Sequence, residues 1–187
     1  KNVFFFEDFS STAVGKSPGN WSSNLVNGEK AVVAETPEAT GKWIVVKGHA
    51  IKLSNLKNSF PSNFELSFDV AVPKDFTWGG KGLELILAKE KTEGVAESFI
   101  NLKLRPGSGG SNGEVTLETK FPSGYANGTK WYVATGFSND KKINRIHVAV
   151  KKSGEVLQVF IDNNTIVEYT KGVPADMLFN ALSFKMS

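Results

Sequence analysis

The feature of this sequence that most restricts its fold is a two-residue alternation of apolar and polar side chains. Residues 64–72 show it most clearly, because every second position is apolar: Phe64, Leu66, Phe68, Val70 and Val72. Successive side chains of a β-strand point to opposite faces, so such a segment has one face on a core and one in water. No segment shows the 3.6-residue period of an amphipathic helix.

The same alternation recurs over residues 83–89, 98–104 and 144–152, and turn residues separate the segments. Ser153-Gly154 and Asn163-Asn164 predict tight hairpin turns, because glycine and asparagine tolerate positive φ angles. Roughly a dozen short strands joined by such turns are typical of an all-β, two-sheet antiparallel sandwich of the jelly-roll type. We therefore predict a single domain over residues 1–187, with at most one helical turn, near residues 174–178.

Composition excludes several classes of function. The chain has no cysteine, which removes disulfides, thiolate metal sites and thiol nucleophiles. The net charge of +3 comes from lysines scattered along the chain, which argues against nucleic acid as a partner. No apolar run approaches the roughly 20 residues that span a bilayer, so no membrane insertion is expected. The start at Lys1 and the lack of cysteine predict export to the periplasm or cell surface.

Three stretches resemble the concanavalin A-like lectin/glucanase superfamily, whose fold is two curved antiparallel sheets. They are the aromatic opening at 5–9 with the Gly-Lys-Ser-Pro-Gly-Asn-Trp run ending at Trp21, the segment 41–46, and the laminin-G-type hairpin 143–169. The whole chain looks most like lectin-like domains of bacterial cell-envelope proteins. Members of this group usually close with a strand after the one matching 178–186. Either that C-terminal strand is missing here, or the first strand, residues 3–9, pairs differently.

Glucanases of this superfamily carry their carboxylates on one strand, in a pattern like Glu-x-Asp-x-x-Glu, so that all face the cleft. Glu65 and Asp69 share a strand face, but at this spacing they lie about 13 Å apart. Glu84 has no acidic residue two or four positions on, and Glu90 and Glu93 fall in a predicted loop. The same-strand pair is absent, so the sequence predicts no catalytic residue and no enzyme. A carboxylate pair from separate strands stays open as an alternative.

Histidine chemistry is not indicated either. The two histidines are His49, at a turn, and His147, on a strand face with Arg145 and Lys151. This setting predicts a surface side chain for His147, rather than a base held in place by a carboxylate. Neither histidine has the surroundings of a triad or a metal site.

Structural calcium is the one cofactor left open. Lectin-like sandwiches hold calcium with loop carboxylates and carbonyls, which need no fixed spacing. Four aspartates lie near predicted strand ends: Asp8, Asp75, Asp140 and Asp162. Each is predicted first as a turn residue whose side chain bonds the local backbone.

Sugar binding needs an exposed aromatic ring with polar groups beside it. Trp78, in the glycine-rich loop 74–82 beside Asp75, is the first candidate, and Tyr125, in the loop 122–127, is the second. Trp21, Trp43 and Trp131 are predicted as core or core-rim residues. Polar side chains on the wet strand faces complete the predicted ligand-binding set: Asp69, Glu84, Asn101 and Lys103.

These observations predict a non-catalytic binding module of the bacterial cell envelope, with carbohydrate or glycoconjugate as its ligand. A first alternative is a glycoside hydrolase of the same superfamily, with carboxylates from separate strands. A second alternative is a structural or adhesive module whose partner is another envelope component.

Overall fold

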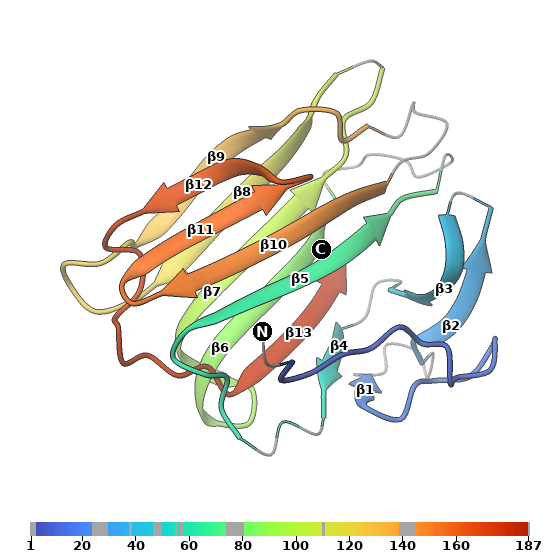
Figure 1. The fold of residues 1–187 in the computed structure, drawn as a ribbon, viewed down its shortest axis with the longest axis horizontal. Coiled ribbons are helices and arrows are strands. Elements are labelled where there is room, and N and C mark those ends of the chain that lie inside the picture. The colour runs from blue at the N-terminus through green and yellow to red at the C-terminus, as the bar shows by residue number, and fades with distance from the viewer. Residues whose placement is uncertain are drawn as a thin grey trace.

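The computed structural model describes residues 3–23, 30–37, 39–46, 50–54, 56, 58–73, 81–109, 111–138 and 145–186. Within them, two antiparallel sheets pack face to face, and the four-stranded sheet lies in front of the seven-stranded sheet in Figure 1. The seven-stranded sheet contains, in spatial order, β1 (Trp21–Ser23), β4 (Ala50–Leu53), β13 (Ala181–Met186), β6 (Leu83–Thr92), β7 (Val95–Arg105), β8 (Gly113–Lys120) and β9 (Gly128–Ala134).

The smaller sheet contains β12 (Asn164–Tyr169), β11 (Val156–Ile161), β10 (Arg145–Ser153) and β5 (Phe64–Ala71), in that order. A separate ribbon of β2 (Val32–Thr36) and β3 (Ala39–Val45) lies to one side of the sandwich (Figure 1). The described residues contain no helix, and residues 174–178 form a turn closed by the Met177 amide, which donates to the Pro174 carbonyl (3.1 Å). The predicted all-β antiparallel sandwich is confirmed.

The core lies between the two sheets and follows the predicted alternation. The inward side chains of β6, β7 and β10 are almost completely buried: Leu85, Leu87, Ile100, Leu102, Leu104, Ile146, Val148 and Val150. Burying one such side chain is worth about 1.5–3 kcal/mol. Because these residues occupy the inner faces, the polar residues between them must lie on the outer faces.

A buried lysine ends the inward series of β10. The ammonium group of Lys152 donates to the carbonyls of Ser62 (2.6 Å) and Ala175 (2.9 Å). Burial lowers the pKa of Lys152, against the smaller opposing effect of Asp176. Lys152 therefore links two connecting segments to the end of the four-stranded sheet.

A tyrosine pair joins the two sheets at one edge. The hydroxyl groups of Tyr132 on β9 and Tyr169 on β12 lie 2.6 Å apart. Burial, followed by this hydrogen bond, raises the pKa of Tyr132 to about 12. The pair connects an edge strand of the seven-stranded sheet to an edge strand of the four-stranded one.

The predicted first strand is wrong. Residues 3–9 lie outside every named strand, and their aromatic rings pack on the sandwich instead, Phe4 against Phe60 and Phe5 against Trp21. The strand β13 is an interior strand, paired with β4 on one side and β6 on the other.

The turn predicted at Asn163-Asn164 is displaced by one residue. Ile161 pairs with Asn164, so the two turn residues are Asp162 and Asn163, with φ angles of 48° and 65°. Aspartate enters the left-handed region nearly as readily as asparagine does, so Asp162 can take the first position of this turn. The Asp162 carboxylate also accepts a hydrogen bond from the His147 amide (2.8 Å), which holds the turn against β10.

We predict that Asn163→Val lowers the free energy of unfolding by about 1–2 kcal/mol, because a β-branched side chain fits the left-handed region poorly. Asn164→Val is the matched control, since Asn164 is an exposed residue of β12 and valine favours strands. Urea unfolding of both variants measures the difference. A larger loss in Asn164→Val than in Asn163→Val would contradict this turn.

Candidate functional site

A polar cluster occupies the outer face of the seven-stranded sheet. We call it the polar face and define it by Glu84 of β6, Asn101, Lys103 and Arg105 of β7, Glu114 of β8 and Trp131 of β9. Strand register places these residues side by side. Glu84 pairs with Lys103, and Arg105 pairs with Glu114. Lys103 also pairs with Thr116, which in turn pairs with Trp131.

Glu84 is the centre of the polar face. Its side chain is only 8% exposed, and its carboxylate lies 3.9 Å from the Lys103 ammonium and 3.2 Å from that of Lys185 on β13. The carboxylate also accepts a hydrogen bond from the Asn101 amide (3.1 Å). A buried charge is costly unless it is paired and hydrogen-bonded, and Glu84 is both. Three neighbouring strands therefore contribute to one ionic network.

The neighbouring charged groups and burial change the pKa of Lys103. Burial, followed by the positive charge of Arg105, lowers the pKa of Lys103, although Glu84 acts in the opposite direction. The side chain is 17% exposed, so its ammonium group lies close to solvent at the centre of the sheet. It can donate hydrogen bonds to a molecule placed on this face.

Trp131 is an exposed ring held in place by a cation. The Arg105 guanidinium lies 5.3 Å from the centre of the Trp131 ring and donates to the Glu114 carboxylate (2.9 Å). Trp131 is nevertheless 58% exposed. The prediction of a core or core-rim residue is therefore wrong for Trp131. Its position on β9 alternates with that of the inward Tyr132, and β9 is an edge strand of its sheet.

Two polar atoms of this face are buried without a partner. Among the described residues, Asn101 Oδ1 and Arg105 Nε have no hydrogen-bond partner. Leaving such atoms unpaired costs free energy. The face thus offers an apolar ring beside charged and amide groups.

The structure brings together three of the predicted site residues and separates the others. Asn101 and Lys103 both contact Glu84, because β6 and β7 are neighbouring strands. Asp69 does not join them, because β5 pairs with β10 in the other sheet and turns Asp69 to the opposite side of the sandwich. The Tyr125 hydroxyl donates to the Glu155 carboxylate (2.7 Å).

The remaining predicted residues lie outside the described residues. Trp78 and Asp75, from the loop 74–80, fall there, and so does His49. Their roles as ligand-binding or turn residues stay predictions.

Asp69 instead organises a second cluster, on the outer face of the four-stranded sheet. It accepts from Arg145 (2.8 Å) and lies 3.0 Å from His147 Nδ1, while Arg145 also stacks on Trp43 at 5.4 Å. His147 is 47% exposed, as predicted for a surface side chain, but the prediction that no carboxylate holds its ring is wrong. Burial opposes ionisation of Asp69, but the hydrogen bonds from His147 and Arg145 outweigh it and hold its pKa below the ordinary value.

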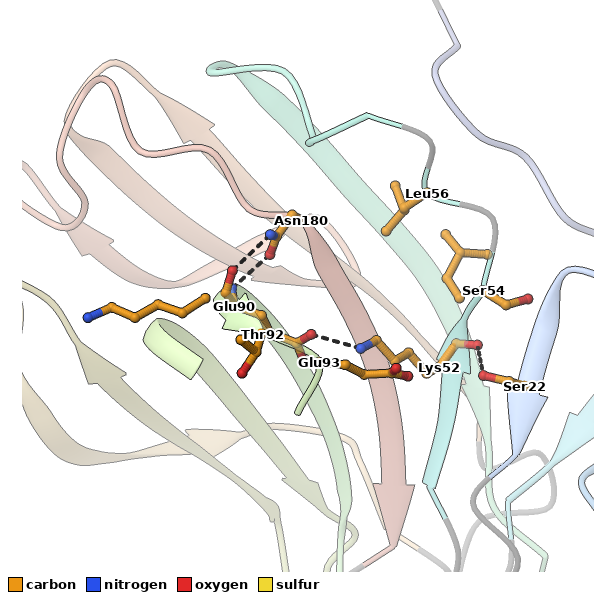
Figure 2. Close-up of a pocket in the computed structure, with 10 residues that line it drawn as sticks. Ser22, Lys52, Ser54, Leu56, Glu90, Thr92, Glu93 and Asn180 are labelled. Carbon is orange, nitrogen blue, oxygen red and sulfur yellow. Dashed lines mark hydrogen bonds and ion pairs between the residues drawn. The ribbon is translucent and has the colours of Figure 1, made fainter. Parts of the chain in front are cut away.

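A cavity of about 480 Å³ opens beside β4, near the end of β6 (Figure 2). Lys52 of β4 and Glu90 of β6 form an ion pair of 2.8 Å inside it. The sequence prediction placed Glu90 in a loop, but β6 continues through it to Thr92. The sequence analysis did not identify Lys52 or Lys185 as site residues. Only the pairing of β13 with β4 and β6 brings these lysines close to the carboxylates.

The calcium candidates give a mixed result. The Asp8 carboxylate accepts from the Ser10 amide (2.9 Å), and Asp162 accepts from the His147 amide, so both bond the backbone. Asp75 and Asp140 lie outside the described residues. The described part of the chain contains no group of three or more histidine, aspartate or glutamate side chains placed to hold a metal.

The described part of the chain also contains no helix long and apolar enough to cross a membrane.

Comparisons with known proteins found relatives only at the level of structure. No protein-family model and no curated protein sequence matches the chain. A family 16 glycoside hydrolase acting in mixed-linkage glucan utilisation by Bacteroides ovatus, solved with a product, is 15% identical with a TM-score of 0.66. The match covers 98% of this chain and 86% of that one. A β-glucanase of Bacillus licheniformis is 11% identical with a TM-score of 0.56, over 92% of this chain and 81% of the other.

These neighbours correct the prediction that the chain is not an enzyme, because the fold it shares over nearly its whole length is a fold of glycoside hydrolases. The prediction relied on the absence of a same-strand carboxylate pair. Glycosidase chemistry needs two carboxyl groups at the right separation, whichever strands supply them.

Asp69 gives the second cluster a defined pH dependence. Its pKa is lowered in the folded protein, so its ionised form stabilises the fold above the ordinary aspartate pKa of about 3.9, and this contribution is lost as the pH falls through the lowered value. We expect Asp69→Asn to lower the melting temperature at neutral pH and to match the unmodified protein in strong acid.

Thermal unfolding over a pH series measures this difference. The control is Glu35→Gln, which changes an exposed strand carboxylate that has no ion-pair partner among the described residues. A destabilisation by Asp69→Asn that is constant from neutral pH to strong acid would show that the ionised carboxylate contributes nothing.

Proposed function

Because its fold is that of the concanavalin A-like lectin/glucanase superfamily, we propose that this chain acts on carbohydrate bound to the polar face. One observation carries the proposal: the exposed Trp131 ring, fixed by Arg105, lies beside the buried network around Glu84. Ligand sites combine apolar, often aromatic, surface with a few well-placed polar groups, and this face has both.

The chemistry of the polar face suits a sugar. One face of a pyranose ring carries C–H groups and can stack on the Trp131 indole, whose face is electron-rich. The hydroxyl groups of the sugar can then pair with Lys103 and with the Glu114 carboxylate, whose side chain is 37% exposed. The ionic network holds these side chains in position before the sugar arrives, which reduces the entropy lost on binding.

The activity that we propose is hydrolysis by carboxylates from separate strands. Glu84 of β6 and Glu118 of β8 both point to the outer face, with β7 between them. From the strand spacing and a register offset of two residues, their Cα atoms lie about 12 Å apart. Inverting glycosidases hold their two carboxyl groups roughly 6.5–9.5 Å apart, and two glutamate side chains at this Cα separation are long enough to reach that range.

In this proposal Glu84, whose carboxylate lies 3.9 Å from the Lys103 ammonium and 3.2 Å from that of Lys185, is the base, and Glu118 is the acid. Glu84 takes a proton from a water molecule, whose oxygen bonds to the anomeric carbon of the sugar. The bond from that carbon to the glycosidic oxygen breaks, and Glu118 gives its proton to the leaving oxygen. The product therefore has the opposite anomeric configuration.

Glucans are the first substrates to test, because the Bacteroides ovatus neighbour was solved with a product of mixed-linkage glucan. We also propose, as the sequence predicted, that the protein is exported to the cell envelope, where it would meet polysaccharide. Carbohydrate is the partner that we propose.

Trp131→Ala should weaken the binding of soluble mixed-linkage gluco-oligosaccharides at least tenfold, because removing the ring removes the stacking surface. Isothermal titration calorimetry measures the dissociation constants. Trp43→Ala is the matched control, since Trp43 stacks on Arg145 on the opposite side of the sandwich. Equal affinities for Trp131→Ala and the unmodified protein would remove the polar face from the proposal.

Glu118→Gln should lower the rate of glucan hydrolysis about 100-fold or more, because the leaving oxygen loses its proton donor. Proton NMR of the first product formed by the unmodified protein should show inversion. Glu168→Gln, on an exposed edge of the other sheet, is the control and should hydrolyse glucan at the normal rate. Retention of configuration, or full activity in Glu118→Gln, would contradict this pair of carboxylates.

A further inference from the structure

Two asparagine–glycine pairs occupy equivalent places in the fold. Asn112-Gly113 leads into β8, and Asn127-Gly128 leads into β9. In both pairs the asparagine is the last residue of a loop and the glycine is the first residue of a strand. A third such pair, at residues 27–28, lies outside the described residues. The two described pairs can therefore be compared directly, because they share their sequence and their position relative to a strand.

An asparagine followed by glycine can lose its side-chain amide without an enzyme. The backbone nitrogen of the glycine attacks the side-chain carbonyl carbon, a C–N bond forms, and the side-chain nitrogen leaves as ammonia with the proton that the backbone nitrogen gives up. Water then opens the resulting five-membered imide at either carbonyl and yields aspartate or isoaspartate. Glycine favours the attack because it has no Cβ to hinder the approach.

Asn127 is held away from this reaction by its own side-chain bonds. Its side-chain oxygen accepts from the Phe121 amide (2.7 Å), and its side-chain nitrogen donates to the carbonyls of Pro122 and Tyr125 (both 3.4 Å). The side chain can turn towards the Gly128 nitrogen only after these bonds break. Each hydrogen bond contributes about 0.5–1.5 kcal/mol, so the loop protects this pair.

Asn112 lacks this restraint. It is exposed, and the described residues give its side chain no hydrogen-bond partner. The loop before it is closed by Ser111, whose amide (3.1 Å) and hydroxyl group (2.6 Å) both donate to the Ser108 carbonyl. The Asn112 side chain is thus free to turn towards the Gly113 amide. That amide belongs to the first residue of β8, and the ends of an element open more readily than its centre.

The fold requires glycine at both positions. A Cβ at Gly113 would lie 2.6 Å from the Phe137 carbonyl oxygen and 2.7 Å from that of Arg105, and neither backbone oxygen can swing away. Gly128 has a φ angle of 91°, which side chains rarely tolerate. Only the hydrogen bonding of the two asparagines therefore distinguishes the pairs.

Deamidation of Asn112 would place a carboxylate beside Arg105. Asn112, Arg105 and Glu114 line the same small cavity of about 150 Å³. The Arg105 guanidinium donates to Glu114 and stacks on Trp131, so a second carboxylate here competes with Glu114 for it. Isoaspartate also adds one carbon to the backbone. The loop has no room for it, because even a Cβ at Gly107 would lie 2.6 Å from the Asn112 carbonyl carbon.

We propose that Asn112 is a site of spontaneous deamidation in the folded protein, and that its conversion weakens the contact between Arg105 and Trp131 at the edge of the polar face. The reaction needs only water. It does not depend on the proposed function, since it follows from the loop alone. Each conversion adds one negative charge to the chain.

Incubation of the folded protein at mildly alkaline pH, followed by acidic digestion and peptide mass spectrometry, measures the conversion of each asparagine. We expect Asn112 to convert at least tenfold faster than Asn127. In denaturant the two asparagines should convert at similar rates, because both are then followed by a glycine in an unfolded chain. This reference shows whether the fold causes the difference.

Two variants test the effect on Arg105. Asn112→Asp reproduces one product, and by NMR it should shift the indole N–H signal of Trp131 and the Nε signal of Arg105 in the same direction as ageing does. Asn112→Gln is the matched control, because it keeps an amide and removes the reactive pair. It should show neither conversion at this position nor a shift on ageing. A thermal melt of each variant checks that it folds.

Each result bears on one part of the inference. Conversion of Asn112 in the folded protein that is no faster than that of Asn127 overturns the site. Unchanged Trp131 and Arg105 signals after complete conversion overturn the effect on the polar face. Neither result changes the case for carbohydrate, which the binding measurements on Trp131→Ala decide separately.

Discussion

The constraint on which the rest of this structure depends is the two-residue alternation of its strands against a core filled from both sides. Leu85 and Leu102 are completely buried between the sheets. Their neighbours Glu84 and Lys103 must therefore face outward, and the antiparallel register places them opposite each other. A shift of one residue in this pairing would turn the leucines to solvent and the charges to the core. The same packing that stabilises the fold thus fixes the positions of the polar groups.

Alternation within a strand was predictable from the sequence, and the choice of partner strand was not. The segment 64–72 was identified as a strand, and β5 covers nearly the same residues, yet Asp69 lies away from Glu84 because β5 pairs with β10. Lys185 was missed because β13 pairs with β6 across nearly 100 residues of chain, and no local pattern reports such a pairing. The outward position of Trp131 follows from register on an edge strand, whereas its size and hydrophobicity suggested the core.

The two outer faces carry carboxylates in different electrostatic settings. Glu84 is 8% exposed and lies between two ammonium groups and an amide. Asp69 is more exposed, and Arg145 and His147 hold its pKa below the ordinary value. Solvent screens an exposed pair such as Asp69 with Arg145, and its contribution to stability is small. Removing one partner from a buried network leaves an uncompensated charge, so the network around Glu84 is more sensitive to the loss of one member.

Opposite charges are paired along the outer face of the seven-stranded sheet. Lys103 and Lys185 share Glu84, Arg105 pairs with Glu114, and Lys52 pairs with Glu90, so these four cations have three carboxylates between them. A polyanion gains affinity by releasing counterions from cations that are free to meet its phosphates, and these cations already have carboxylate partners. This side of the sheet presents the exposed Trp131 ring together with hydrogen-bonding groups of positive and negative charge. Such a surface suits the neutral sugar that we propose as its ligand, because hydroxyl groups can pair with groups of either charge.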